Sequence, residues 1–229
     1  DAEMRAELLC SCGLLLEHAG SRILIDAPNG TIPPFYEFPD AEMQKLLDGT
    51  GVYSGLCGVF FTHLHPDHYD EARMNALLCR RGALTTFLPD KQMPETITRT
   101  AGPFTVECRR FPHIPAPKFP DVAHYVLLVT AGGRSVYITA DAVPDAAAHR
   151  AVLHGRRPQL AFWNSQSLSY PDMRALLREE TEQSAIYHMP VDPADQSGIR
   201  RKSERNMQRY GAELPNVRVL TQYPSELNV

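Results

Sequence analysis

Short apolar runs separated by glycine- and proline-containing turns recur along this chain. Two pairs of such runs surround glycine turns, residues 14–18 with 22–26 and residues 122–130 with 134–140. A glycine turn between two apolar runs is typical of a β-hairpin. Further apolar runs predict strands at residues 59–62, 83–88, 104–111, 159–163, 184–187 and 217–220.

Helical patterns alternate with these strands. Pro171 suits the first turn of a helix, and Gly82 suits a helix end. Helices are expected at residues 40–48, 70–81, 171–182 and 195–210, with a short helical segment after Pro89. The alternation indicates the α/β class. No linker or repeat interrupts it, so a single domain over residues 1–229 is expected.

Residues 28–39 form a long irregular segment that fits neither pattern. They contain four prolines together with Phe35, Tyr36 and Phe38. Long irregular loops with aromatic residues often form part of a substrate pocket, and we expect the same here.

Composition and charge limit the binding partners and cellular locations to be expected for this protein. The formal net charge is −4, so no general basic field attracts nucleic acid. The five cysteines are odd in number and have no C-x-x-C spacing, which favours reduced thiols in a cytoplasmic protein. No apolar run is long enough for a membrane span, and no export signal is recognisable.

The densest chemical signal is His63-Leu64-His65-Pro66-Asp67-His68, directly after the apolar run 59–62. A strand end fixes the backbone, so side chains placed there point in defined directions. Neutral imidazole and carboxylate are the ligands expected for zinc, and also for manganese or iron. Other polar residues also follow predicted strands, at Asp26, His113, Asp141 and His188. Together these positions predict one polar rim that binds metal.

The ordered set Asp26, His63-x-His65-x-Asp67-His68, a middle histidine, Asp141 and His188 resembles the metallo-β-lactamase superfamily. The resemblance covers nearly the whole chain. It implies an αββα sandwich, in which two mixed sheets are flanked by helices, with a two-metal site at its edge. The sequence departs from the family pattern at residue 140, because the family usually has glycine before the acid and this chain has Ala140 before Asp141.

The resemblance also implies roles for these residues. His63, His65 and the middle histidine would hold the first metal, and Asp67, His68 and His188 the second. Asp141 would bridge both metals, and Asp26 would orient the histidine cluster through hydrogen bonds. The ambiguous position is the middle histidine.

Both His113 and His124 have an acceptable spacing to Asp141. We favour His113 as the ligand, which leaves His124 as a catalytic residue that contacts the substrate or donates a proton to the leaving group. A hydrogen-bonded strand residue is the alternative for His124.

The function implied is a dinuclear metallohydrolase with two divalent ions, zinc first and manganese or iron as alternatives. A metal-bridging hydroxide would attack, because two cations lower the pKa of water toward about 7. Asp67 is expected to orient this nucleophile or to carry a proton.

Phosphodiesters rank first as substrates, because two ions about 3.5–4 Å apart match in-line phosphoryl displacement. Lactones, esters or thioesters follow, and a non-catalytic metal-binding module is the alternative outside enzymes. The cluster lacks the glutamate of the diiron relatives, which disfavours a redox role. We expect a small-molecule substrate and no nucleic-acid or membrane partner, and we leave a homodimer open.

Overall fold

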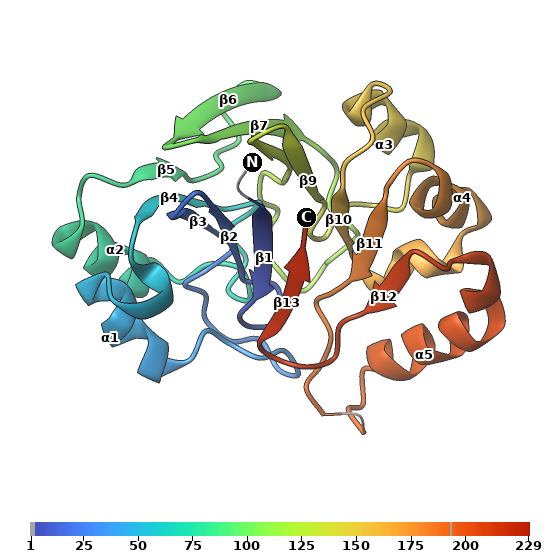
Figure 1. The fold of residues 1–229 in the computed structure, drawn as a ribbon. Coiled ribbons are helices and arrows are strands. Elements are labelled where there is room, and N and C mark those ends of the chain that lie inside the picture. The colour runs from blue at the N-terminus through green and yellow to red at the C-terminus, as the bar shows by residue number, and fades with distance from the viewer. Residues whose placement is uncertain (1–2, 193) are drawn as a thin grey trace.

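The structure is a computed structural model that describes residues 3–192 and 194–229. Two mixed β-sheets face each other, and helices cover the outer face of each (Figure 1). The first sheet has the order β13-β1-β2-β3-β4-β5. Its strands are β1 Met4–Leu8, β2 Leu14–His18, β3 Ser21–Ile25, β4 Leu56–Phe60, β5 Thr85–Phe87 and β13 Ser225–Asn228.

The second sheet has the order β12-β11-β10-β9-β8-β7-β6. Its strands are β6 Thr96–Ala101, β7 Phe104–Arg110, β8 Tyr125–Ala131, β9 Arg134–Ile138, β10 Leu160–Trp163, β11 Gln183–Ile186 and β12 Val217–Val219. The strands β9 to β12 are parallel, as are β3, β4 and β5, whereas the hairpins are antiparallel. This αββα arrangement confirms the predicted fold class.

The helices α1 (Asp40–Asp48) and α2 (Glu71–Arg80) lie against the first sheet. The helices α3 (Ala146–Leu153), α4 (Pro171–Glu179) and α5 (Ile199–Tyr210) lie against the second (Figure 1). No helix within residues 3–192 and 194–229 combines the length and the apolarity that a bilayer crossing requires.

Three apolar clusters hold these layers together. The central cluster joins the facing sheets, and it includes Leu16 and Ile25 from one sheet and Leu127 and Phe162 from the other. Each outer cluster joins a sheet to its helices. Alternate residues of a strand point to opposite faces, so a strand between two clusters must be apolar on both. The strand β8 shows this directly, because all of its residues except Thr130 are buried.

Several boundaries differ from the sequence prediction. No helix follows Pro89, where the chain forms a turn before the strand β6. The strands β1, β6 and β13 and the helix α3 were not predicted. The helix α5 begins at Ile199 rather than at 195. The missed strand β6 is an edge strand that exposes most of its side chains, so its apolar pattern is weak.

Candidate metal centre

The polar residues predicted at strand ends converge in the structure. Their ligand atoms form two groups, and the atoms within each group all lie within 4.8 Å of one another. The first group contains His63, His65 and His113. The second contains Asp67, His68, Asp141 and His188. All seven predicted ligands therefore meet, while their metal binding itself stays a prediction.

The backbone is strained where it delivers these side chains. Asp26, Ala140 and His188 have φ values of 54°, 47° and 63°, in the left-handed region that favours glycine. Such conformations cost of order 1–3 kcal/mol each and persist only where the surrounding structure imposes them. Main-chain hydrogen bonds hold two of these residues, from the Asp26 amide to Phe60 O (2.9 Å) and from the His188 amide to Ser11 O (2.9 Å).

Each histidine of the first group is anchored through one ring nitrogen. His63 Nδ1 lies 3.0 Å from Thr62 Oγ1, His65 Nε2 lies 2.8 Å from Pro120 O, and His113 Nδ1 contacts Ile114 O. Metal-ligating histidines usually make such a bond with the nitrogen that does not bind the metal. The opposite nitrogens of two of them, His63 Nε2 and His113 Nε2, are buried without a hydrogen-bond partner.

Asp141 lies between the two groups. Its Oδ2 is 3.3 Å from both His63 Nε2 and His113 Nε2 and 3.2 Å from His68 Nε2, whereas its Oδ1 is 3.7 Å from His188 Nε2. Burial would raise the pKa of this carboxyl group, but attraction to His68 and His188 outweighs burial and holds the pKa well below its usual value. An ionised carboxylate with oxygens toward both groups is suited to the predicted bridging position.

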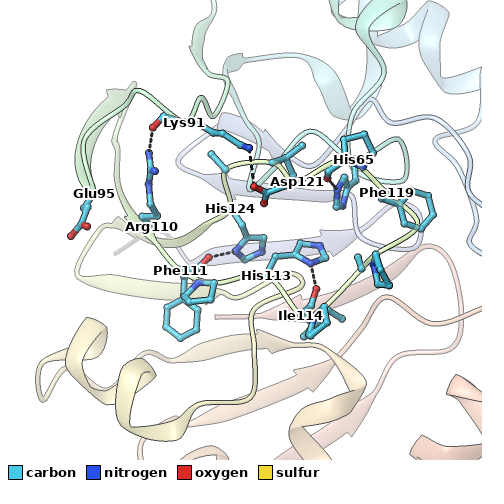
Figure 2. Close-up of a pocket in the computed structure, with 17 residues that line it drawn as sticks. His65, Lys91, Glu95, Arg110, Phe111, His113, Ile114, Phe119, Asp121 and His124 are labelled. Atoms are coloured by element: carbon cyan, nitrogen blue, oxygen red, sulfur yellow. Dashed lines mark hydrogen bonds and ion pairs between the residues drawn. The ribbon is translucent and has the colours of Figure 1, made fainter.

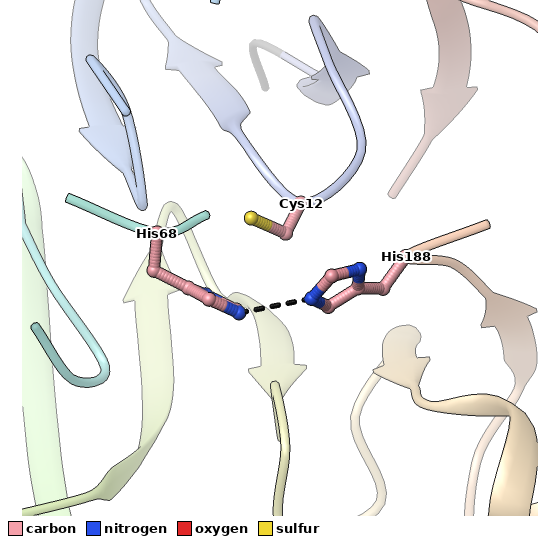
Figure 3. A group of neighbouring side chains, drawn as sticks. All are labelled: Cys12, His68 and His188. Atoms are coloured by element: carbon pink, nitrogen blue, oxygen red, sulfur yellow. Dashed lines mark hydrogen bonds between the residues drawn. The ribbon is translucent and has the colours of Figure 1, made fainter. Parts of the chain in front are cut away.

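The second group places ring nitrogens face to face. His68 Nε2 and His188 Nε2 are 3.0 Å apart (Figure 3), and Asp67 Oδ2 is 3.0 Å from His188 Nε2. Two imidazole lone pairs at this distance repel each other unless a proton or a cation lies between them. A divalent cation would relieve this repulsion and would also pair with Asp67.

Asp26 hydrogen-bonds to His68 Nδ1, the ring nitrogen opposite the one that faces the second group. The carboxyl group is fully buried; Oδ1 accepts from the Thr62 amide (2.8 Å), and Oδ2 accepts from Thr62 Oγ1 (2.7 Å) and His68 Nδ1 (2.9 Å). A proton fixed on His68 Nδ1 leaves the lone pair on Nε2, which faces the second group. This is the orienting position predicted for Asp26.

The two candidates for the middle histidine differ in their contacts. His113 belongs to the first group, whereas both nitrogens of His124 are engaged elsewhere. His124 Nδ1 donates to Phe111 O (3.1 Å), and Nε2 accepts from the Asp141 amide (3.2 Å). Burial lowers the pKa of His124 to about 3, so the ring is neutral at pH 7. The catalytic role predicted for His124 remains untested, and these bonds favour a positioning role beside Asp141.

Asn164, which directly follows β10, also positions Asp141. Asn164 Nδ2 donates to Ala140 O (3.0 Å) and to Ala142 O (2.8 Å), the two carbonyls on either side of Asp141. Asn164 is 6% exposed, so these bonds are shielded from water. The turn after β9 is thereby fixed to the end of β10.

A cavity of about 210 Å³ opens over both groups. Its polar wall contains Asn164, Ser165 and Gln166, and its apolar wall consists of Ile32, Phe35, Ile114, Pro115, Ala116, Phe119 and Ile199. Phe35 packs edge-to-face on His188, with ring centroids 4.2 Å apart. The proline-rich segment 28–39 therefore contributes to the pocket, as its composition predicts.

A larger cavity of about 890 Å³ adjoins the first group beside His65 and His113 (Figure 2). Its basic side chains are Lys91 and Arg110. Lys91 Nζ pairs with Asp121 Oδ2 at 2.8 Å. Arg110 donates to the carbonyls of three residues in the 90–93 turn and to a tyrosine hydroxyl. Both cations thus already have partners within the protein.

The donor set suits divalent cations. Five imidazoles and two carboxylates are borderline-to-hard ligands, typical of zinc, iron or manganese sites. The unpartnered nitrogens of His63 and His113, and the facing nitrogens of His68 and His188, are polar atoms that a bound cation would satisfy. The residues present therefore fit the metal ions that the resemblance implies.

Comparison with known proteins identifies the fold of this chain. No family model and no curated protein matches this chain. Among solved structures, it is similar to the metallo-β-lactamase fold protein YhfI from Bacillus subtilis, at 15% identity over 100% of both chains with a TM-score of 0.66. It is also similar to a possible metal-dependent hydrolase from Veillonella parvula DSM 2008, at 16% identity over 99% of both chains with a TM-score of 0.66.

A third similar structure is CmlA, a diiron beta-hydroxylase from Streptomyces venezuelae. The match has 13% identity and a TM-score of 0.68, and it covers all of this chain but 55% of CmlA. At such low identities the likeness concerns the fold. This chain has the metallo-β-lactamase fold, with a candidate metal site at the strand ends, as the sequence resemblance implies.

Proposed function

We propose that this protein is a metal-dependent hydrolase with two divalent ions, zinc being the expected metal. The observation that carries the proposal is the meeting of two ligand groups at one shared carboxylate, Asp141, beneath an open cavity. Bound divalent cations would polarise the substrate and lower the pKa of a water molecule.

The protein side chains would bind the cations and accept the proton of the attacking water molecule. Asp67 lines the cavity, so its carboxylate can accept a proton from a water molecule that attacks a substrate there. Burial would raise the pKa of Asp67, but attraction to His68 and the hydrogen bond from His188 lower it overall. Asp67 is therefore an ionised base at neutral pH.

The cavity favours an uncharged substrate. Among the described residues that line it, there is no lysine or arginine, and most of its wall is apolar. In the adjoining cavity, Lys91 and Arg110 are occupied by protein partners. Phosphoryl transfer commonly relies on basic side chains as well as metal ions. We therefore place carboxylic esters, thioesters or lactones first and phosphodiesters second, which reverses the ranking predicted from the sequence.

The test compares substrate classes at known metal content. Zinc- and manganese-loaded protein is assayed with p-nitrophenyl butyrate, a γ-lactone, an acyl thioester and bis-p-nitrophenyl phosphate, beside Asp67→Asn. Glu71→Gln, an exposed change of the same type on α2, is the matched control. We expect ester or lactone turnover that Asp67→Asn abolishes and Glu71→Gln retains. Faster turnover of the diester would favour a phosphodiesterase, and no turnover by the fully loaded protein would favour a non-catalytic metal-binding module.

A further inference from the structure

A cysteine lies beside the second ligand group. Cys12 follows β1 in a turn, and its sulfur belongs to a third group of possible ligand atoms with His68 and His188 (Figure 3). These three atoms lie within 4.8 Å of one another, and the Cys12 side chain is fully buried. His68 and His188 are also members of the second group, so the two groups share two histidines.

The contacts of Cys12 hold its sulfur in place. Sγ donates to Asp67 O at 3.0 Å, which ties the thiol to the backbone of a predicted ligand. Asn29 Nδ2 approaches the same sulfur at 3.7 Å and donates to Asp67 O at 2.7 Å. A nearby N–H donor is the kind of outer contact that tunes a metal-bound sulfur. In addition, His188, which belongs to the same ligand group as Cys12, has a ring nitrogen, Nδ1, that is buried without a hydrogen-bond partner.

We propose that Cys12 is a sulfur ligand of the cation held by the second group. The inference rests on the proposed function, because it assumes that this group binds a metal ion. When the bond forms, sulfur exchanges its proton for the metal ion, and the proton passes to solvent. A soft sulfur ligand favours zinc, cadmium and cobalt over manganese, which prefers oxygen. The two halves of the centre would then differ in metal preference, since the first group contains only imidazoles.

Cys10 provides a matched control on the same turn. It is also fully buried, and it also contacts Asn29, with Asn29 Nδ2 3.5 Å from its sulfur. It belongs to none of the ligand groups found among the described residues. A serine at either position removes one buried sulfur, but only the change at Cys12 removes a candidate ligand.

The test is the absorption spectrum of the cobalt-substituted protein. Wild type and Cys10→Ser are expected to show a near-ultraviolet sulfur-to-cobalt charge-transfer band, and Cys12→Ser is expected to lack it. Cys12→Ser should also bind cadmium at least tenfold more weakly, with manganese binding unchanged. X-ray absorption of the zinc-loaded wild type gives a measurement that needs no variant, and should show a sulfur neighbour at about 2.3 Å.

Two results would overturn the proposal in different ways. Full cobalt loading without the band, or a band that survives in Cys12→Ser, would exclude Cys12 as a ligand and leave the proposed hydrolase intact. Failure of the wild type to bind cobalt, zinc or cadmium would overturn both the sulfur ligand and the metal-dependent function.

Discussion

The hydrogen bonds of Asp26 make the tautomer of His68 testable. In Asp26→Asn the side chain keeps its size, and its remaining oxygen can still accept from the Thr62 amide. The amide nitrogen then replaces Oδ2, which accepts from Thr62 Oγ1 and from His68 Nδ1. Because an amide NH₂ only donates, two donors would face each other at His68 Nδ1. The imidazole is expected to move its proton to Nε2, which removes the lone pair that faces the second group.

The expected effect falls mainly on metal affinity at the second group. Changes to outer partners of metal-ligating histidines typically cost 10–100-fold in affinity, or about 1.4–2.8 kcal/mol. Two of the three hydrogen bonds to a fully buried carboxyl group are lost here, so we expect a loss near the upper end, about 100-fold. The first group depends on Asp26 only through Thr62 and His63, and should lose less than about tenfold.

The assay is competitive zinc titration with a chromophoric chelator, combined with metal analysis after dialysis. Thr62→Ser is the control, because it retains a hydroxyl group between Asp26 and His63. We expect two zinc ions bound to the wild type and to Thr62→Ser, and one retained by Asp26→Asn. Two sites of unchanged affinity in Asp26→Asn would refute the argument that Asp26 sets the tautomer of His68. Urea unfolding of the metal-free proteins would show whether the variant is folded.

Two further predictions concern residues outside the ligand set. His149 is 1% exposed, stacks on Phe111 and bonds to Tyr137, and burial lowers its pKa from 6.5 to about 4. The neutral ring therefore stabilises the fold above pH 6.5, and this contribution is lost as the pH falls toward 4. In urea unfolding, the free energy of unfolding of metal-free wild type should fall by about 2 kcal/mol more between pH 7 and pH 5 than that of His149→Gln. Equal decreases in the two proteins would contradict this prediction. Asn164→Ala leaves the carbonyls of Ala140 and Ala142 without their donor, and should lower the free energy of unfolding by about 1–3 kcal/mol. Gln166→Ala, a neighbouring change that removes neither bond, should stay near wild type.

The regular elements with strong patterns could be predicted from sequence. Both hairpins, the helices α1, α2 and α4 and the strands β7 and β10 lie within a few residues of their expected positions. The elements that were missed have weaker local signals. The strand β13 has one buried residue, Leu227, and its place in the sheet comes from pairing with β1 at the other end of the chain. Such long-range pairing leaves no local trace.

The same distinction applies to the metal centre. The convergence of the candidate ligands was predictable because each follows an apolar strand, and strands that run parallel end at the same edge. The sequence favoured His113 over His124 without deciding between them, because both lie in the segment that connects β7 to β8. The structure separates them through partners distant in sequence, since the amide of Asp141 occupies His124 Nε2 and leaves only His113 with a free nitrogen.

Cys12 illustrates why ligand chemistry needs the folded structure. The sequence resemblance implies a bridging role for Asp141 and assigns no role to Cys12. The turn after β1 approaches the metal centre because β1 and β2 belong to the sheet that also carries Asp26, and the His188 amide bonds to Ser11 O in the same turn. The Cys12 sulfur thus lies beside two histidines of the second ligand group through a contact that motif spacing does not encode, and under the proposed sulfur ligation the metal preference would depend on that contact.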